Sequence, residues 1–171
     1  MKGIYFSYWL LGLMVALPSW AKTIPVSASM DVEFELPQVQ ASIYARPYVA
    51  VWIEDKQRQP VRTMQLWVGD DEWLKDLRSW WRKVGRDDRS VVDAVTSATR
   101  PVGQHRFTWD GLDQQGKRVE QGDYTFYVEV VREHGGRNYI RQKITLGEES
   151  FDLQIAPTEE TGNIALHYQL N

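Results

Sequence analysis

Four small residues in a row, Thr96-Ser97-Ala98-Thr99, present hydroxyl groups with little bulk around them. They lie in residues 85–103, a stretch of nearly twenty residues in which no clear strand pattern occurs. Connections of that length inside a compact domain are uncommon and are often functional. Small neighbours leave a hydroxyl accessible in a narrow extended loop. The chemistry to expect there is therefore modification of a Ser or Thr side chain.

The same stretch also has a purely structural interpretation. Ser90 can act as the N-cap of one helical turn from Val91 to Val95, with Asp93 three residues later forming most of a capping box. Arg100-Pro101 would then end the turn, because a residue before proline avoids the helical region. On this interpretation the hydroxyl of Thr99 only closes a turn.

Residues Asp93–Thr99 (DAVTSAT) resemble the acceptor motif of extracytoplasmic flavoproteins, D-x-x-[ST]-[GS]-A-[ST]. In those families a separate FAD:protein FMN transferase attaches FMN to the last hydroxyl through a phosphoester bond, outside the cytoplasm. The resemblance implies that Thr99 is the acceptor and Asp93 the acidic motif position. Thr96, Ser97 and Ala98 would be the small run that lets the transferase approach, although glycine is commoner where Ser97 stands. A bulky neighbour of Thr99 would block in-line attack on the FAD pyrophosphate.

The three histidines stand alone in the sequence. His105, His134 and His167 show neither H-x-x-x-H nor H-x-H spacing, so no metal site is predicted from them. His134 lies at the tip of a predicted hairpin, where side chains are available for function. Two roles remain open for it: a solvated turn residue, or a hydrogen-bond partner or proton relay near a flavin. His105 and His167 fall on predicted strands as half-exposed positions.

Composition excludes several classes of chemistry. The chain has 171 residues and no cysteine, which removes disulfides, thiolate metal sites and thiol catalysis. A formal charge of −3 without a basic block argues against nucleic acid as the main partner. No nucleophile elbow, Walker loop, dinucleotide fingerprint or zincin helix is present. The sequence thus favours an electron carrier or a binding module over a catalyst.

The first residues predict export. Met1-Lys2 is a short positive region, and Ile4–Leu17 is an apolar run too short for a comfortable transmembrane helix. Small residues at Ser19 and Ala21 fit signal-peptidase spacing, so we expect a signal peptide at 1–21 and a mature chain from Lys22 that is not embedded in the membrane. An uncleaved signal anchor is the alternative. Residues 22–171 are expected to form a single domain.

Beyond the leader the dominant period is two, which predicts strands. One predicted hairpin joins Ile43–Glu54 to Val61–Val68. The other expected strands are Asp31–Leu36, Phe107–Trp109, Tyr124–Arg132, Asn138–Leu146, Phe151–Ile155 and Ile164–Leu170. About eight strands with these spacings predict an all-β, immunoglobulin-like antiparallel sandwich. The exception is a short amphipathic helix at about 71–83, whose tryptophans are expected to pack in the core or, alternatively, to stack on a ligand.

A second resemblance covers about Phe34 to Leu146. Residues Trp109–Tyr124 look like the W-D-G-x-D-x-x-G-x-x-V-x-x-G-x-Y signature of immunoglobulin-like domains related to the flagellar-hook capping protein. With the following Arg132-Glu133-His134-Gly135-Gly136, the chain resembles the predicted periplasmic family called domain of unknown function 2271. The resemblance implies a periplasmic immunoglobulin-like sandwich and gene neighbours that include PepSY-type membrane proteins and flavin transferases.

The residues of the tryptophan–glycine signature are expected to be structural. Its glycines, 111, 116 and 122, permit positive φ in tight turns. Calcium is the rival interpretation. However, Asp110, Asp113 and Asp123 lack the alternate spacing of a calcium loop, and no metal is predicted.

Two functions from different classes follow. The first is an exported carrier with FMN on Thr99 that relays electrons between a membrane reductase, of PepSY type on the resemblance, and a periplasmic acceptor. The flavin would do the redox work, while the protein sets its exposure and potential. The second is a non-redox periplasmic binding or interaction domain, for instance an accessory to metal or iron uptake.

Overall fold

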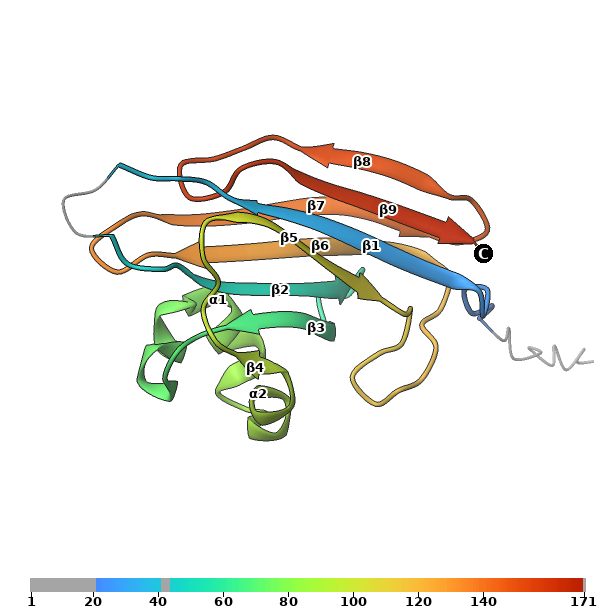
Figure 1. Cartoon of the computed structure of the whole chain (residues 1–171). Coiled ribbons are helices and arrows are strands. Elements are labelled where there is room, and N and C mark those ends of the chain that lie inside the picture. Colours follow the sequence, from blue (N-terminus) through green and yellow to red (C-terminus); the bar gives the residue numbers. More distant parts are fainter. Residues whose placement is uncertain (1–20, 41–43, 171) are drawn as a thin grey trace, which may run out of the picture.

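Two β-sheets packed face to face form the body of the protein (Figure 1). The computed structural model describes residues 21–40 and 44–170. The predicted signal peptide, up to Trp20, lies outside the described residues. The architecture confirms the expected all-β sandwich.

The four-stranded sheet has the order β5-β1-β9-β8, and its strands pair antiparallel. Its members are β1 (Ala28–Leu36), β5 (Gly103–Trp109), β8 (Phe151–Ile155) and β9 (Ile164–Leu170). β1 alternates strictly, with every second residue buried against the facing sheet. This alternation is typical of a strand with one face in the core and one toward water.

The second sheet has the order β4-β3-β2-β6-β7. Its members are β2 (Tyr48–Asp55), β3 (Pro60–Trp67), β4 (Thr96–Ser97), β6 (Gly122–Val131) and β7 (Arg137–Leu146). The strand expected from Ile43 begins at Tyr48, and Ile43 itself lies outside the described residues. β4 is not among the expected strands, and it pairs parallel with β3 rather than antiparallel.

β2 is buried on both faces, which explains its nearly continuous apolar sequence. Val49, Val51 and Ile53 belong to the core between the sheets. Ala50 and Trp52 belong to a second core on the outer face of the same sheet, together with residues of the helical insertion. The molecule therefore has three layers where the insertion, residues 69–95, covers the sheet (Figure 1).

The insertion is helical, but the single helix expected at 71–83 is wrong in detail. A 3-10 helix (Asp71–Asp76) is followed by one α-helical turn, α1 (Arg78–Trp80), and a π-helical turn (Trp81–Gly85). The break is at Leu77, whose φ of −75° and ψ of 64° are not helical. Leu77 is completely buried, so packing against the sheet determines the break. A second α-helix, α2 (Arg89–Val95), completes the insertion.

The tryptophans of the insertion are packing residues, as expected. Trp80 is fully buried, and its indole N–H donates to the hydroxyl of Thr63 at 3.0 Å. Trp73 stacks on Tyr48 with ring centroids 6.1 Å apart. At Gly85 an added Cβ would lie 2.6 Å from the Trp81 ring, so the close approach of the chain requires glycine.

One buried carboxylate fastens the insertion to the sheet. Glu129, in the middle of β6, is 0% exposed and accepts hydrogen bonds from the backbone N–H groups of Ser79 and Trp80 at 3.0 and 2.9 Å. The guanidinium of Arg137 donates to the same carboxylate at 2.8 Å and also to the Ser79 hydroxyl at 2.8 Å. The carboxylate thus satisfies N–H groups that have no partner inside the short helix.

The tryptophan–glycine signature forms turns, as predicted. Its glycines, 111, 116 and 122, have φ values of 77°, 77° and 152°. The Trp109 indole donates to the carbonyl of Leu112 at 2.8 Å, and Asp113 accepts from the backbone N–H groups of Gln115 and Lys117 at 2.9 and 2.8 Å. The carboxylates of the signature therefore stabilise turns.

No helix in the described ranges, 21–40 and 44–170, has the length and apolar character needed to cross a membrane.

Candidate functional site

The acceptor-like stretch lies where the chain crosses from one sheet to the other. α2 ends at Val95, and β4 follows immediately along the edge of β3, with Thr96 opposite Leu66 and Ser97 opposite Trp67. The Val68 N–H donates to the Ser97 carbonyl at 2.9 Å and closes this short pairing. Residues 98–102 then lead to β5 in the four-stranded sheet (Figure 1). This crossover carries Thr99.

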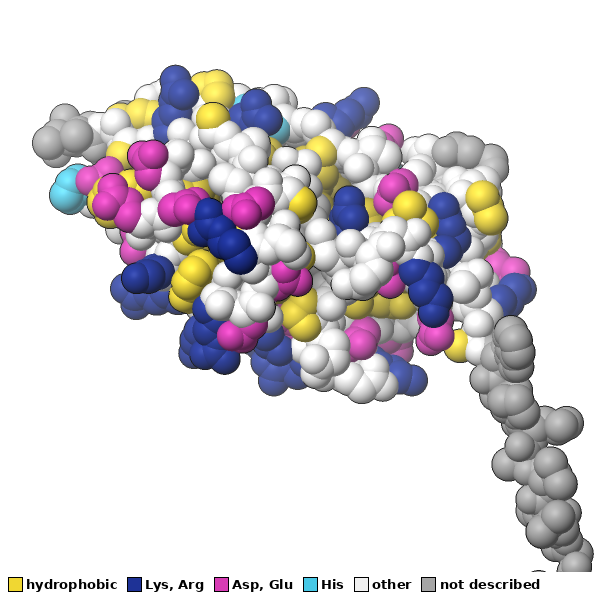
Figure 2. All heavy atoms as spheres, turned by 90° about the horizontal axis from the view of Figure 1, so that it is seen from below, with side chains coloured by type: hydrophobic (Ala, Val, Ile, Leu, Met, Phe, Trp, Pro, Cys, Tyr) yellow, Lys and Arg dark blue, Asp and Glu magenta, His cyan; other side chains and the backbone are white. Residues whose placement is uncertain are grey.

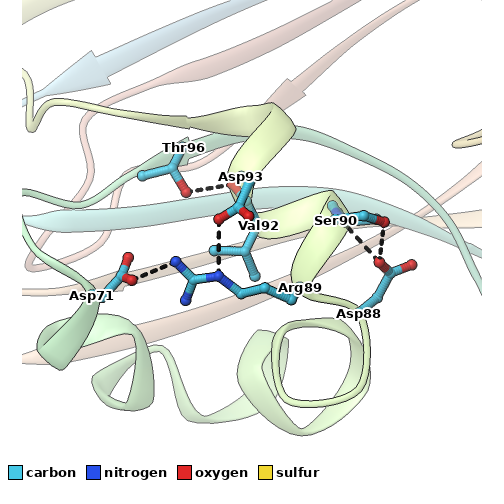
Figure 3. A network of polar contacts seen from close by, with 8 residues as sticks. Asp71, Asp88, Arg89, Ser90, Val92, Asp93 and Thr96 are labelled. Carbon is cyan, nitrogen blue, oxygen red and sulfur yellow. Dashed lines mark hydrogen bonds and ion pairs between the residues drawn. The ribbon is translucent and has the colours of Figure 1, made fainter.

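The cap of α2 differs from the expectation. Asp88, not Ser90, is the N-cap residue: its carboxylate accepts from the Val91 N–H at 3.1 Å and from the Ser90 hydroxyl at 2.6 Å (Figure 3). The hydrogen bond from Ser90, followed by that from the Val91 backbone, lowers the pKa of Asp88. Both residues are suitable caps, and the chain enters the helix earlier than the capping-box pattern indicates.

Asp93 lies on the exposed side of α2. Its carboxylate pairs with Arg89 four residues earlier, at 2.8 Å, and Arg89 also pairs with Asp71 of the insertion (Figure 3). The hydrogen bond to Asp71 is the largest cause that raises the pKa of Arg89. These pairs are solvent-exposed and contribute little to stability. Asp93 is thus an exposed position of α2 that is paired with Arg89.

The hydroxyl groups of the small run differ in what they bind. Thr96 donates its hydroxyl to the Val92 carbonyl at 2.6 Å, which ends α2 (Figure 3). Ser97 makes a long contact of 3.5 Å to the Leu66 carbonyl. Within the described part of the chain the Thr99 hydroxyl has no hydrogen-bond partner, and its side chain is half-buried between exposed neighbours, Ala98 and Arg100. Among the hydroxyl groups of Asp93–Thr99, that of Thr99 is thus the one without a hydrogen bond in the described part of the chain.

The crossover is held on both sides of Thr99. Before it, β4 is bonded to β3. After it, the Arg100 guanidinium lies over the ring of Trp67, 5.8 Å from the centroid, and the His105 imidazole meets the same ring edge-on at 5.2 Å. His105 Nε2 lies 2.8 Å from the Pro101 carbonyl and donates to it. From the sequence, His105 is expected to be a half-exposed strand residue without a particular role. Its contacts with Pro101 and Trp67 instead help to fix the segment that carries Thr99.

The structure brings Asp93, Thr96, Ser97 and Thr99 together in one short segment, but it does not bring His134 to them. His134 lies at the β6–β7 turn with a φ of 55° and a side chain that is 72% exposed. That turn is at one end of the sandwich, away from α2 and the crossover (Figure 1). Its nearest charged partner is the neighbouring Glu133, at 3.5 Å.

The R-E-H-G-G turn instead contains a buried ion pair that sequence reasoning missed. Arg132 donates to both carboxylate oxygens of Glu160, at 2.8 and 3.0 Å, and the Gly136 N–H donates to Glu160 at 2.7 Å. An added Cβ on Gly135 would lie 2.6 Å from the Arg132 guanidinium, and one on Gly136 would lie 2.6 Å from Glu160. The glycines are needed so that the turn can fold around this ion pair. The motif contains Arg132 and both glycines, but Glu160 is distant in sequence, so the pair could not be recognised from the motif alone.

No metal site forms among the described residues: no group of three or more His, Asp or Glu side chains is placed to hold an ion. The carboxylates of Asp110 and Asp113 accept backbone hydrogen bonds in their own turns, which accounts for them.

One comparison with known proteins shows the family of this chain, and none shows its function. The profile of a family described as "Predicted periplasmic protein (DUF2271)" matches residues 29–163. Among solved structures, a truncated form of FlgD from Helicobacter pylori (strain 26695) is similar, with 18% identity, a TM-score of 0.34, and coverage of 77% of this chain and 74% of that one. No curated protein matches. The family match spans most of the chain, and this protein is accordingly a periplasmic member of the DUF2271 family.

Proposed function

We propose that this protein carries FMN covalently on Thr99 and relays electrons between a membrane reductase and a periplasmic acceptor. The observation that carries the proposal is the state of the hydroxyls in Asp93–Thr99. The hydroxyl at the last motif position has no hydrogen-bond partner among the described residues, while Thr96 is bonded to the backbone of α2. A free hydroxyl next to a small residue, Ala98, is what a modifying enzyme must reach.

Attachment needs a co-substrate and an enzyme, FAD and an FMN transferase. The Thr99 oxygen would form a phosphoester bond with the phosphorus of the FMN half of FAD, the pyrophosphate P–O bond would break, AMP would leave, and the hydroxyl proton would pass to solvent. Ala98 beside Thr99 leaves room for this in-line approach. Bound FMN would supply one- and two-electron transfer, and a covalent bond prevents its loss outside the cytoplasm.

The surroundings fit a tethered group. Thr99 lies in a crossover fixed at β4 on one side and at Trp67, through Arg100 and His105, on the other. An anchored segment gives the attached group a defined starting point on the surface, and the exposed Arg100 offers a cation beside the phosphoester. The carboxylate of Asp93, on the exposed side of α2, is available to the transferase.

The test is the intact mass of the mature protein purified from the periplasm of cells that contain an active FMN transferase. Attached FMN adds about 438 Da, the mass of FMN less water. The adduct is expected in the wild type and in Ser90→Ala, which removes an exposed hydroxyl outside Asp93–Thr99, and it should be absent from Thr99→Ala. Far-ultraviolet circular dichroism of the variants verifies folding.

Two outcomes oppose the proposal. An unmodified wild type beside a transferase that modifies another substrate in the same cells would reject flavin attachment. An adduct that persists in Thr99→Ala would move the site elsewhere. If the adduct forms on Thr99 but neither membranes nor periplasmic extract change its redox state, attachment stands and the relay does not.

A further inference from the structure

A basic hollow lies on the outer face of the five-stranded sheet, where the helical insertion does not cover it. Its volume is ≈ 870 Å³, and its lining comes from the β2–β3 turn, β6 and β7. This size is within the usual range for small-molecule sites. Figure 2 shows the molecule from below, with Lys and Arg side chains distributed around its outline among Asp and Glu. The hollow shares no lining residue with the segment that carries Thr99.

Four cations from two separate parts of the chain line this hollow. Lys56 and Arg58 come from the β2–β3 turn, and Arg141 and Lys143 come from β7. Each of the ion pairs formed within the described residues involves other side chains, so these four have no carboxylate within 4.0 Å in that part of the protein. The chain as a whole has a formal charge of −3, which makes a local group of unpaired cations notable.

The two acidic side chains of the lining are already engaged. Asp55 accepts a hydrogen bond from the Gln59 N–H at 2.8 Å, and Asp123 accepts one from the Thr145 hydroxyl at 2.9 Å. The Asp55 carboxylate is thus oriented toward its own turn, and the Asp123 carboxylate toward the neighbouring strand β7. The cations therefore exceed the acids in the lining by two, from four against two.

Protection of a sheet edge explains part of this pattern but not all of it. β7 is an edge strand, and charged residues on an edge discourage pairing with other chains. Arg58 is not on an edge strand, and it holds a left-handed backbone conformation, with a φ of 63°, that favours Gly or Asn. The Lys83 ammonium donates to the Arg58 carbonyl at 2.7 Å and fixes the turn. Arg58 lines the same hollow as the cations of β7, so protection of the β7 edge does not account for the whole group.

The floor of the hollow is aromatic and ordered. Tyr127 lies there, 4% exposed, in a cluster with Trp52 and Tyr139, whose ring centroids are 4.9 and 5.7 Å from its own and 6.1 Å from each other. The Arg141 guanidinium lies over the Tyr139 ring, 5.9 Å from its centroid, which limits its rotamers. Guanidinium groups bind phosphate through paired hydrogen bonds.

We infer that this hollow binds a small molecule that carries phosphate groups. The guanidinium groups of Arg58 and Arg141 and the ammonium groups of Lys56 and Lys143 are the hydrogen-bond donors available to those groups. This site is independent of flavin attachment, so it can be tested on protein that carries no flavin.

The experiment is isothermal titration of the unmodified mature protein with AMP, adenosine and inorganic pyrophosphate at low ionic strength. We expect saturable binding of AMP and of pyrophosphate, and none of adenosine. The double variant R141Q/K143Q should weaken AMP binding by at least about tenfold, because it removes two charge-assisted hydrogen-bond donors. A control with the same charge change on the insertion, K75Q/R78Q, should bind AMP within about twofold of wild type, as expected of screened surface charges.

A second variant separates binding from folding. Arg58→Asn relieves the left-handed backbone, so it should raise the thermal midpoint while it weakens AMP binding. The inference is overturned if AMP does not bind saturably, if K75Q/R78Q weakens binding as much as R141Q/K143Q, or if Arg58→Asn leaves the affinity unchanged.

Discussion

Replacing Glu129 by glutamine tests whether one carboxylate holds the helical insertion on the sheet. In the native protein this carboxylate, 0% exposed, accepts from the N–H groups of Ser79 and Trp80 and from the Arg137 guanidinium. Glutamine keeps the shape but offers one acceptor oxygen, and its amide N–H₂ must face donors. At least one set of donors is then left without an acceptor.

The size of the effect follows from the hydrogen bonds that glutamine cannot accept. Hydrogen bonds to a buried charged group contribute about 1.5–3 kcal/mol each, and breaking a buried ion pair costs about 3–5 kcal/mol. The Arg137 side chain is 35% exposed and can recover water, which favours the lower end. We expect Glu129→Gln to lower the free energy of unfolding by about 3 kcal/mol.

Urea unfolding of the mature protein measures this destabilisation. With a slope of about 2 kcal/mol per molar urea, the midpoint should fall by about 1.5 M. Hydrogen exchange should also show faster exchange of the Ser79 and Trp80 amides, because their acceptor is weakened. Glu133→Gln, on an exposed side chain of the next turn, is the matched control and should stay within about 0.5 kcal/mol of wild type. A decrease below about 1 kcal/mol for Glu129→Gln, with unchanged amide protection, would refute the reasoning.

Three further outcomes follow from the geometry. Gly136→Ala should cost about 2 kcal/mol or more in chemical unfolding, because the new Cβ would lie 2.6 Å from Glu160. Gly116→Ala, with open space around it but a φ of 77°, should cost only about 1 kcal/mol, so equal costs would contradict the steric argument. Burial raises the pKa of Tyr124 to about 12 from 10.0, so between these pH values the unfolded chain loses a proton that the folded chain keeps. Stability should therefore decline as pH rises through that window, and Tyr124→Phe should make the decline shallower in pH-dependent thermal unfolding.

Much of the framework could be predicted because its strands are encoded locally. The predicted strands Phe151–Ile155 and Ile164–Leu170 have the bounds that the structure shows, since each is a short alternating or apolar run between turn residues. The break at Leu77 and the parallel pairing of β4 could not be predicted in this way. Both depend on interactions with β3 and β6 that are distant in sequence.

The candidate site also has a part that is encoded locally and a part that depends on contacts distant in sequence. The motif residues of Asp93–Thr99 are neighbours in sequence, so their proximity needed no tertiary information. Which hydroxyl stays free depends on the Val92 and Leu66 carbonyls, and only the fold shows that. The basic face of β7 had a readable signal, cations at alternate positions 137, 141 and 143, but the matching residue Arg58 lies on another turn.

The parallel pairing of β4 with β3 brings the two ends of the insertion, residues 69–95, together on the sheet. The chain leaves β3 after Trp67 and returns at Thr96 beside Leu66, so the two ends of the excursion meet on the sheet. Closing a loop whose ends already meet depends weakly on its length, about 0.6 kcal/mol for each doubling. An insertion of another length or fold at this position therefore leaves the strand order of the sheet unchanged. The crossover that begins at Ala98 would keep its position. The β3–β4 pairing at the ends of the insertion positions it, and the helices within the insertion do not.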